Sequence, residues 1–298
     1  MKFYNDIVAT RPLIEESIKR FGYAPEHNVD HYIYTNADYK QGVFVHFPDG
    51  AGLLARRDVT DWDILSEPVA ASGRRVEVLL EFISEALKDA SLKKVTVELY
   101  TETRRALLAV IPKTLRARRV AFTLQWPVFD LAKFDPLLPG GRYKDLRNAR
   151  NAFYRDHRVE VRDVREVPKS ALVSIVEAWK KNRQARDKAY TKLYRAYIDN
   201  AFRGTTHARA LVVDGHVAGI NAGWKIPNTN TYYAAIGLHD YSFRDLGDML
   251  NLEDLAFLKA AGYTHADFAG GEKALTRYKL KFGEAEIYKS FVFSVVRK

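Results

Sequence analysis

The stretch DFAGGEKALTRYKLKFG, residues Asp267 to Gly283, contains the end of a strand, a double-glycine turn and a basic amphipathic helix. Its apolar pattern predicts a strand over residues 264–268 and a helix over residues 272–281. Between them, Gly270-Gly271 lets the backbone turn at positive φ or approach a ligand closely. This order of elements indicates a site at the end of a strand, with a plain tight turn as the alternative.

The helix in this stretch has one apolar face. Leu275, Tyr278 and Phe282 recur at i, i+3 and i+7, so we expect all three to face the core. Lys279 and Lys281 are then free to project from the helix. A solvated basic face is the simpler explanation for such lysines.

The same residues carry a family resemblance. The block D-F-x-G-G-x-x-x-L-x-x-Y/F-K-x-x-F-G resembles the last signature block of the FemABX peptidyltransferases and of the lysylphosphatidylglycerol synthase C-terminal domain. The resemblance is good over residues 264–296, fair over 142–263 and weak before that. It implies an α/β (α+β) fold of two tandem GNAT-like domains, each with a mixed, mostly antiparallel sheet flanked by helices.

The order of predicted elements supports a duplication. Each half contains a helix, a strand, a second helix and a β-rich stretch, at residues 76–90, 94–99, 102–110 and 117–131, and again at 246–261, 264–268, 272–281 and 286–296. The run FDPLLPGGR, residues 134–142, interrupts the periodicity with two prolines and two glycines. We therefore expect an N-terminal domain at 1–134 and a C-terminal, catalytic domain at 135–298.

Further elements follow from periodicity and turn signals. Asp214-Gly215 between apolar runs predicts a hairpin. We expect strands at 31–35, 42–47, 52–56, 208–213, 216–225 and 231–238, and helices at 143–156, 169–186 and 190–202.

Composition limits the classes of function. The chain of 298 residues is 47% hydrophobic and has no cysteine, so disulfides, thiolate catalysis and Cys-based metal sites are excluded. No apolar run suits a signal peptide or a membrane span, and we expect a soluble, cytoplasmic protein. The formal charge of +10 is concentrated between residues 142 and 203, where seventeen Lys/Arg face eight Asp/Glu. Such a region attracts a polyanion or an anionic membrane surface, although a merely soluble basic protein is equally compatible with it.

The helix RYKDLRNARNAFYRDHR places basic and aromatic groups together. Arg147, Arg150 and Tyr154 share one face, where arginine forks suit phosphate and a tyrosine ring suits a base or sugar. Related transferases have a similar R-N-A helix, which implies a tRNA contact here. Trp224 and Tyr233 lie on the strands predicted at residues 216–225 and 231–238. We expect them to bind substrate as well.

The loop before residue 246 bears on the donor substrate. In an acyl-CoA-dependent GNAT enzyme, a Q/R-x-x-G-x-G/A loop binds pyrophosphate at a helix N-terminus. Here Arg244 and Gly247 keep part of that motif, but Met249 replaces its last small residue, and Asp245 and Asp248 repel phosphate. We expect Asp245 to be an N-cap. The departure counts against acetyl-CoA.

Signatures of other chemistry are weak. His27 and His31 stand at H-x-x-x-H spacing, but they run into a predicted strand, so we expect no metal site. There is no G-x-S-x-G elbow and no phosphate-binding P-loop. His239-Asp240, at a predicted strand end, is a candidate general base for an attacking amine, with a surface-loop pair as the more common outcome.

The resemblance assigns the remaining roles. It implies that Lys279 lies near the acceptor end of tRNA and stabilises the leaving ribose oxygen, and that Asp267 orients the nucleophilic amine. Gly270, Gly271 and Tyr278 belong to the same expected substrate site. The resulting hypothesis is transfer of an amino acid from aminoacyl-tRNA to a lipid head group, cell-wall precursor or peptide-like metabolite, without a cofactor and with peripheral membrane contact as an option. An acyl-CoA-dependent N-acyltransferase and a non-catalytic RNA-binding module are the alternatives.

Overall fold

The computed structural model describes residues 1–36, 41–182 and 191–298. In the first half the apolar alternation builds short strands that are covered by helices. The elements, in chain order, are β1 (Lys2–Tyr4), α1 (Arg11–Phe21), α2 (Val29–Thr35), β2 (Gln41–His46), β3 (Gly52–Arg57), β4 (Asp61–Ile64), α3 (Arg75–Ala86), β5 (Lys94–Tyr100), α4 (Thr101–Val110), β6 (Leu115–Ala117) and β7 (Phe122–Asp130).

The second half repeats the alternation with longer strands. Its elements are α5 (Lys144–Asp156), β8 (Val159–Asp163), α6 (Lys169–Lys181), α7 (Thr191–Asp199), β9 (His207–Val213), β10 (His216–Lys225), β11 (Thr231–His239), α8 (Leu246–Ala260), β12 (His265–Asp267), α9 (Lys273–Lys279) and β13 (Ala285–Arg297).

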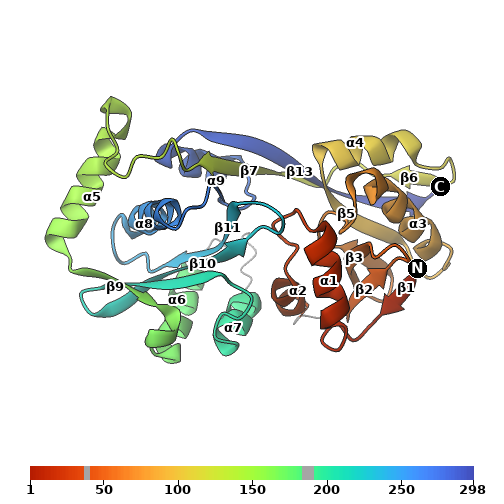
Figure 1. The fold of residues 1–298 in the computed structure, drawn as a ribbon, viewed down its shortest axis with the longest axis horizontal. Helices are drawn as coiled ribbons and strands as arrows, with labels where there is room; N and C mark the ends of the chain where they lie inside the picture. The colour runs from red at the N-terminus through yellow and green to blue at the C-terminus, as the bar shows by residue number, and fades with distance from the viewer. Residues whose placement is uncertain (37–40, 183–190) are drawn as a thin grey trace.

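One long mixed sheet runs through the molecule (Figure 1). Within the described residues it has thirteen strands in the order β1-β2-β3-β4-β5-β13-β7-β12-β11-β10-β9-β8, with β6 beside β13. The pairs β4–β5 and β11–β12 are parallel, and the other pairs are antiparallel. This confirms the predicted fold class.

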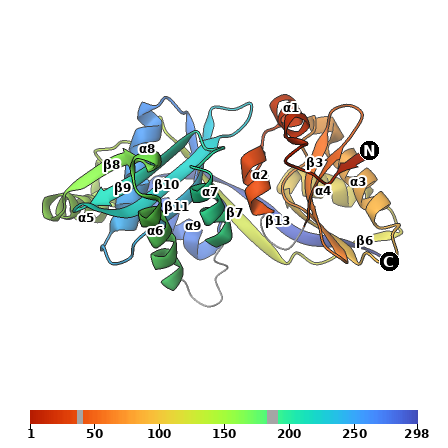
Figure 2. The same ribbon diagram turned by 90° about the horizontal axis from the view of Figure 1, so that it is seen from below.

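The two halves exchange their last strands. β7, from the first half, pairs with β12 and β13, and β13, from the end of the chain, pairs with β5, β6 and β7. Figures 1 and 2 both show β7 and β13 crossing between the two ends of the molecule. The sheet is therefore continuous across the boundary predicted at residue 134, and that boundary stays a prediction.

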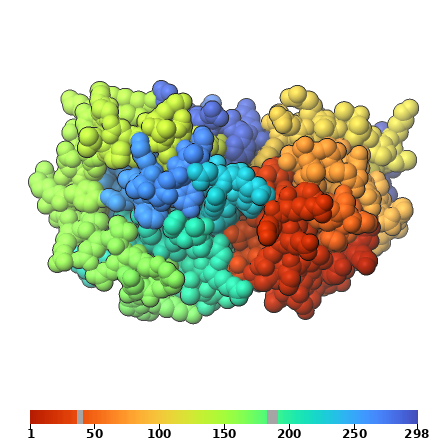
Figure 3. Space-filling view, viewed as in Figure 1, coloured from red at the N-terminus to blue at the C-terminus, as the bar shows by residue number. Residues whose placement is uncertain are grey.

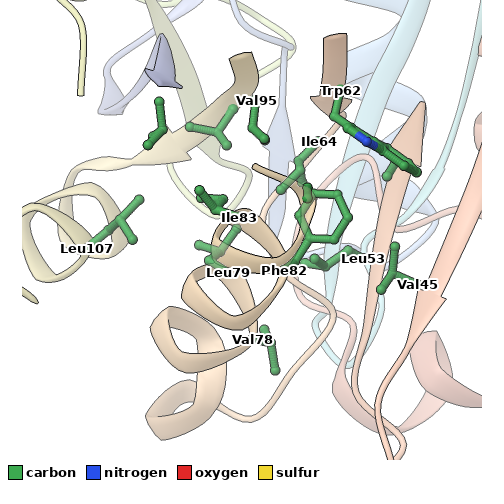
Figure 4. Packing of buried hydrophobic residues seen from close by; sticks show 14 of the residues in the cluster. Val45, Leu53, Trp62, Ile64, Val78, Leu79, Phe82, Ile83, Val95 and Leu107 are labelled. Carbon is green, nitrogen blue, oxygen red and sulfur yellow. The ribbon is translucent and has the colours of Figure 1, made fainter. Parts of the chain in front are cut away.

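Separate hydrophobic clusters fill the two halves. In the first, side chains from α3 pack against the strands, as Figure 4 shows for Val78, Leu79, Phe82, Ile83, Val45, Leu53, Trp62, Ile64, Val95 and Leu107. β13 contributes Phe293 and Val295 to this cluster. In the second half, α8 and β12 form one cluster, and α6, α7 and β10 form another on the opposite side.

The N-terminal segment joins the halves. Trp224 Nε1 donates a hydrogen bond of 2.7 Å to the Pro25 carbonyl, and Asn28 Nδ2 donates one of 2.7 Å to the Gly204 carbonyl. Figure 3 shows these N-terminal residues, in red, packed against the second half. The strand predicted at 31–35 is wrong, because the segment is helix α2. The Asn28 side chain accepts a hydrogen bond of 3.0 Å from the His31 amide and so caps this helix. The run of aromatic residues in the segment had favoured a strand in the sequence analysis.

Most other elements agree with the sequence. The hairpin at Asp214-Gly215 is confirmed, with both residues at positive φ, 51° and 83°. Helix α6 ends at Lys181, and the remainder of the predicted helix at 169–186 lies partly outside the described residues.

Candidate active site

The turn after β12 is built around Ala269 and Gly270. Ala269 takes the left-handed conformation, with φ of 62°, and the Asp267 Oδ1 atom accepts from its amide at 2.9 Å. Of the two alternatives expected for Gly270-Gly271, positive φ occurs at neither glycine. Gly270 is needed instead for close approach, because a Cβ atom there would lie 2.6 Å from Cε2 of Trp126.

Two further contacts fix this turn. Gly271 exchanges both backbone hydrogen bonds with Gln125 of β7, at 2.9 and 3.0 Å. The Lys279 ammonium donates to the carbonyl oxygens of Phe268 and, at 3.0 Å, of Ala269. The side chain of the last residue of helix α9 therefore contacts the turn that precedes the helix. The structure brings Asp267, the two glycines and Lys279 together, as predicted.

Burial perturbs both ionisable groups of the turn. It raises the pKa of the Asp267 carboxyl to about 6, although Tyr288, the Ala269 amide and Lys279 oppose the shift. It lowers the pKa of the Lys279 ammonium to about 8, although Asp267 opposes that shift. Near neutral pH the carboxyl is mostly ionised and the amine mostly protonated.

Aromatic side chains of β7 and β13 line the site beside Asp267. The Tyr288 hydroxyl donates to Asp267 Oδ2 at 2.6 Å, and its ring stacks on Trp126 with centroids 5.5 Å apart and an interplanar angle of 11°. Trp126 Nε1 donates to Ser290 Oγ at 2.9 Å, and Ser290 Oγ donates to Glu98 Oε1 at 2.5 Å. A hydrogen-bonded chain therefore connects the two halves of the molecule.

Three glutamates surround this chain. Burial raises the pKa of Glu26 well above its ordinary value, and the charges of Glu98, Asp267 and Glu67 raise it further. Glu67 is itself buried and accepts from the Tyr23 hydroxyl at 2.6 Å and the Tyr100 amide at 2.6 Å. A bound cation would favour the ionised form of these four carboxyl groups.

A cavity of about 410 Å³ opens among these groups. Glu67, Tyr100, Asp267 and Tyr288 contribute to its wall. The buried Tyr100 hydroxyl has no hydrogen-bond partner among the described residues. Arg75 and Lys289 also line the cavity, so its wall combines carboxyl groups and aromatic rings with two cations. The carboxyl groups and rings together suit a small ligand with an ammonium group.

Helix α9 differs from the prediction on two faces. Its α-helical part ends at Lys279 and tightens to a 3₁₀ turn over Leu280–Phe282, which changes the angular spacing of the side chains. Phe282 is fully buried as predicted, but Leu275 is 44% exposed. Lys281 is not free, because its ammonium pairs with Asp248 and lies 4.2 Å from the centroid of the Tyr278 ring.

A second group of predicted residues gathers at the N-terminus of α8. A Cβ atom on Gly247 would lie 2.8 Å from Cε1 of His239, so the histidine ring fills the space beside this glycine. The Tyr278 hydroxyl donates to Asp248 Oδ1 at 2.9 Å. Asp245 occupies the N-cap position, as predicted, but it takes the left-handed conformation with φ of 61° and makes no side-chain capping bond. Burial lowers the pKa of His239, although the charges of Asp248 and Asp240 oppose that shift.

The remaining loop residues of this group are more exposed. Asp240 Oδ1 accepts from the Ser242 amide at 2.9 Å, which is the geometry of an Asx turn. Arg244 lies 3.6 Å from Asp245 and its side chain is 94% exposed. Neither contact forms a pyrophosphate cradle, and the two acidic side chains at this helix end disfavour one.

The basic face predicted on α5 is engaged within the protein. Arg147 donates to the carbonyl oxygens of Leu138 and Gly140, and Arg150 donates to that of Pro136. The Tyr154 hydroxyl donates to Glu253 of α8. These side chains fix the loop before α5, and Figures 1 and 2 place that helix at the end of the molecule away from α4.

The two aromatic residues predicted on β10 and β11 lie at the junction of the halves. Trp224 is 2% exposed and packs on His31 and Tyr233, so it is part of the core. Tyr233 is also buried. Burial raises its pKa, and the charges of Glu26, Asp267 and Glu98 raise it further. Only the tyrosine borders the candidate site.

Sequence reasoning missed half of this site. Trp126, Tyr288 and Glu98 meet because β13 pairs with β7 and β5, which also brings Ser290 to Glu98 across 192 positions of sequence. Glu26 lies in the segment between α1 and α2. One signal was available in KVTVELY, where the glutamate stands on the polar face of an otherwise alternating strand.

Neither metal clusters nor spanning helices occur in the described ranges. No group of three or more His, Asp or Glu side chains there is arranged to hold a metal ion. In the same residues, no helix has the length and apolar character needed to cross a bilayer.

Solved structures define the class of fold. L-PGS from Bacillus licheniformis has a TM-score of 0.70 at 14% identity, and the match covers 96% of this chain and 91% of that one. FemX gives 0.61 at 12% identity, with 99% and 97% covered. A tandem GNAT protein from the clavulanic acid biosynthesis pathway gives 0.59 at 14%, with 99% and 98% covered. The chain has this tandem GNAT-like fold.

The sequence places the chain within one family of that class. The family model described as phosphatidylglycerol lysyltransferase, C-terminal, matches residues 22–285, and the chain belongs to this family. No curated protein matches it in a search by sequence. The membership confirms the resemblance carried by the block at residues 267–283.

Proposed function

We propose that this protein is an aminoacyltransferase that moves an amino acid from aminoacyl-tRNA to an amine or hydroxyl of an acceptor. The observation that carries the proposal is the pair Asp267 and Lys279, whose pKa values of about 6 and about 8 lie on either side of neutrality. At pH 7 one group is ready to accept a proton and the other to donate one. Membership in a lysyltransferase family supports the same class of reaction.

The step needs little more than positioning, because an aminoacyl ester is already activated. The acceptor nitrogen or oxygen attacks the ester carbonyl carbon and loses its proton to Asp267. The bond from that carbon to the ribose oxygen then breaks, and Lys279 donates a proton to the leaving oxygen. A new amide or ester bond forms and free tRNA leaves, with no oxidant or reductant required.

The acidic cavity supports an aminoacyl donor. An aminoacyl ester carries an α-ammonium group, and the carboxyl groups of Glu67 and Asp267 line the cavity that would receive it. Glu26 and Glu98 interact electrostatically with this pair. The Tyr100 side chain lines the same cavity. We expect the ammonium to lower the raised pKa values of these carboxyl groups when it binds.

The acyl-CoA alternative has less support. A diphosphate at the N-terminus of α8 would meet Asp245 and Asp248, and His239 already occupies the space beside Gly247. We expect no micromolar binding of CoA by calorimetry. Detection of such binding would favour an acyl-CoA-dependent N-acyltransferase.

Turnover with mixed aminoacyl-tRNA tests the proposal. The protein should consume the aminoacyl ester faster than spontaneous hydrolysis when an acceptor such as phosphatidylglycerol or a simple amine is present. Asp267→Asn should abolish this excess, and Lys273→Met, an exposed change on α9, should leave it intact. Binding of tRNA without any excess turnover would identify a non-catalytic RNA-binding module.

A further inference from the structure

A group of exposed cations without ion-pair partners among the described residues lies outside the basic region predicted at 142–203. Residues 105–122, here called the basic edge, comprise the end of α4, β6 and the first residue of β7. The segment contains five Lys/Arg and no Asp or Glu. All five are exposed, and none forms an ion pair in the described part of the chain. They are Arg105, Lys113, Arg116, Arg118 and Arg119.

The region at 142–203 differs in this respect. Arg155 pairs with Asp156 at 2.8 Å, Arg165 with Asp163 at 2.5 Å, and Arg158 with Glu160 at 2.8 Å. Local carboxylates thus neutralise much of that region, whereas the cations of the basic edge pair with no carboxylate of residues 1–36, 41–182 and 191–298. Charge complementarity therefore favours the basic edge as the contact for a large anion.

Apolar side chains are interleaved with these cations. Val110 is 54% exposed and Phe122 is 46% exposed, and Ile111 and Val120 are half-buried beside them. RNA would gain little from the aliphatic side chains of Val110, Ile111 and Val120, whereas the interfacial layer of a bilayer accepts them together with the Phe122 ring and the neighbouring arginines. The combination is that of a peripheral lipid contact.

The basic edge is connected to the candidate active site through β7 and β13. Figures 1 and 2 place α4 and β6 at the end of the molecule remote from α5. β7 begins at Phe122 and reaches Gln125, the partner of Gly271, three residues later, which is about 10 Å along an extended strand. The arginines of the edge lie farther away, since Arg116 pairs with Val296 of β13, eight residues beyond Tyr288 and about 26 Å along the strand.

We propose that the basic edge docks the protein on an anionic bilayer, with the cations near lipid phosphates and Val110 and Phe122 inserted at the interface. The inference does not depend on the proposed reaction, since docking is measured without turnover. Each cation near an anionic surface contributes about fivefold in affinity, and salt weakens the contribution.

Co-sedimentation with vesicles tests it. The parent should bind vesicles of equal parts phosphatidylcholine and phosphatidylglycerol, and should bind phosphatidylcholine alone weakly. The triple change Arg116→Glu, Arg118→Glu and Arg119→Glu should weaken binding by about a hundredfold or more. The control triple Arg155→Glu, Arg158→Glu and Arg165→Glu, with the same change in net charge at exposed positions, should have a much smaller effect.

A second variant separates lipid from RNA. Val110→Ser with Phe122→Ser should weaken vesicle binding and leave binding of bulk tRNA unchanged, and circular dichroism verifies that each variant is folded. Equal effects of the two charge triples, or none, would overturn the proposal. So would retained vesicle binding by the serine variant, and loss of tRNA binding alone in the Arg116 triple would assign the edge to RNA.

Discussion

Lys279 is fixed in place by two carbonyl oxygens of the turn, so its ammonium is positioned before a substrate arrives. Because one preorganised charge acts mainly on the transition state, we expect Lys279→Met to lower kcat by about a hundredfold. Some stability is lost as well, about 1–3 kcal/mol, because two carbonyl groups lose their donor. Single-turnover kinetics with aminoacyl-tRNA measures the first effect and urea unfolding the second.

The choice of control follows from the contacts of α9. Lys281 pairs with Asp248, so its substitution disturbs the end of α8 and is not neutral. Lys273 is exposed on the same helix and forms no ion pair with the residues that the structure describes. Lys273→Met should keep both kcat and stability, and an equal loss in the two lysine variants would remove Lys279 from the reaction.

The pH dependence of the rate follows from the same two groups. Asp267 must be ionised to accept a proton, so activity should rise as pH increases through about 6. Lys279 must be protonated to donate one, so activity should fall as pH increases through about 8. A bell-shaped profile of kcat/KM is expected. Lys279→Arg should displace the upper limb to higher pH, and an unmoved upper limb would show that another group produces it.

The position of Gly270 in the turn after β12 leaves no room for a side chain. A Cβ atom there meets the Trp126 ring, which holds Tyr288 by stacking and Ser290 by a hydrogen bond. Gly270→Ala should therefore destabilise the protein by about 1–3 kcal/mol and reduce turnover as the Tyr288–Asp267 bond is displaced. Gly73→Ala, where nothing lies within 4 Å, is the matched control. Equal unfolding midpoints in the two variants would contradict this account.

Local pattern predicted most elements, including the strand and helix around Gly270-Gly271, since their periodicity and turn residues lie within a few positions of one another. It failed at α2, where the Asn28 cap and packing on the second half outweigh the strand-like run His31–Thr35. It also failed to identify Trp126 and Tyr288, because their register depends on pairing of β7 with β13. The spacing of residues within a single sequence does not show which residues of β7 pair with which residues of β13.

At the scale of the whole molecule, β7 and β13 make the two halves interdependent. A fragment of residues 1–134 would lack β13, which separates β5 from β7 and supplies Phe293 and Val295 to the first core. A fragment of residues 135–298 would lack β7, the partner of β12, and the N-terminal segment that accepts from Trp224. Each fragment would expose apolar surface and unpaired strand edges.

We therefore expect neither fragment to fold alone, even though the sequence divides there into two similar halves. The intact chain should unfold in one cooperative transition, with tryptophan fluorescence and circular dichroism giving the same urea midpoint. Trp62 in the first half and Trp224 at the junction make fluorescence sensitive to both parts. Two separated transitions, or a soluble fragment 1–134 with a cooperative unfolding curve, would show that the exchanged strands contribute little. Coincident transitions and aggregated fragments would mean that the acidic cavity, which draws on both halves, forms only when the whole sheet is complete.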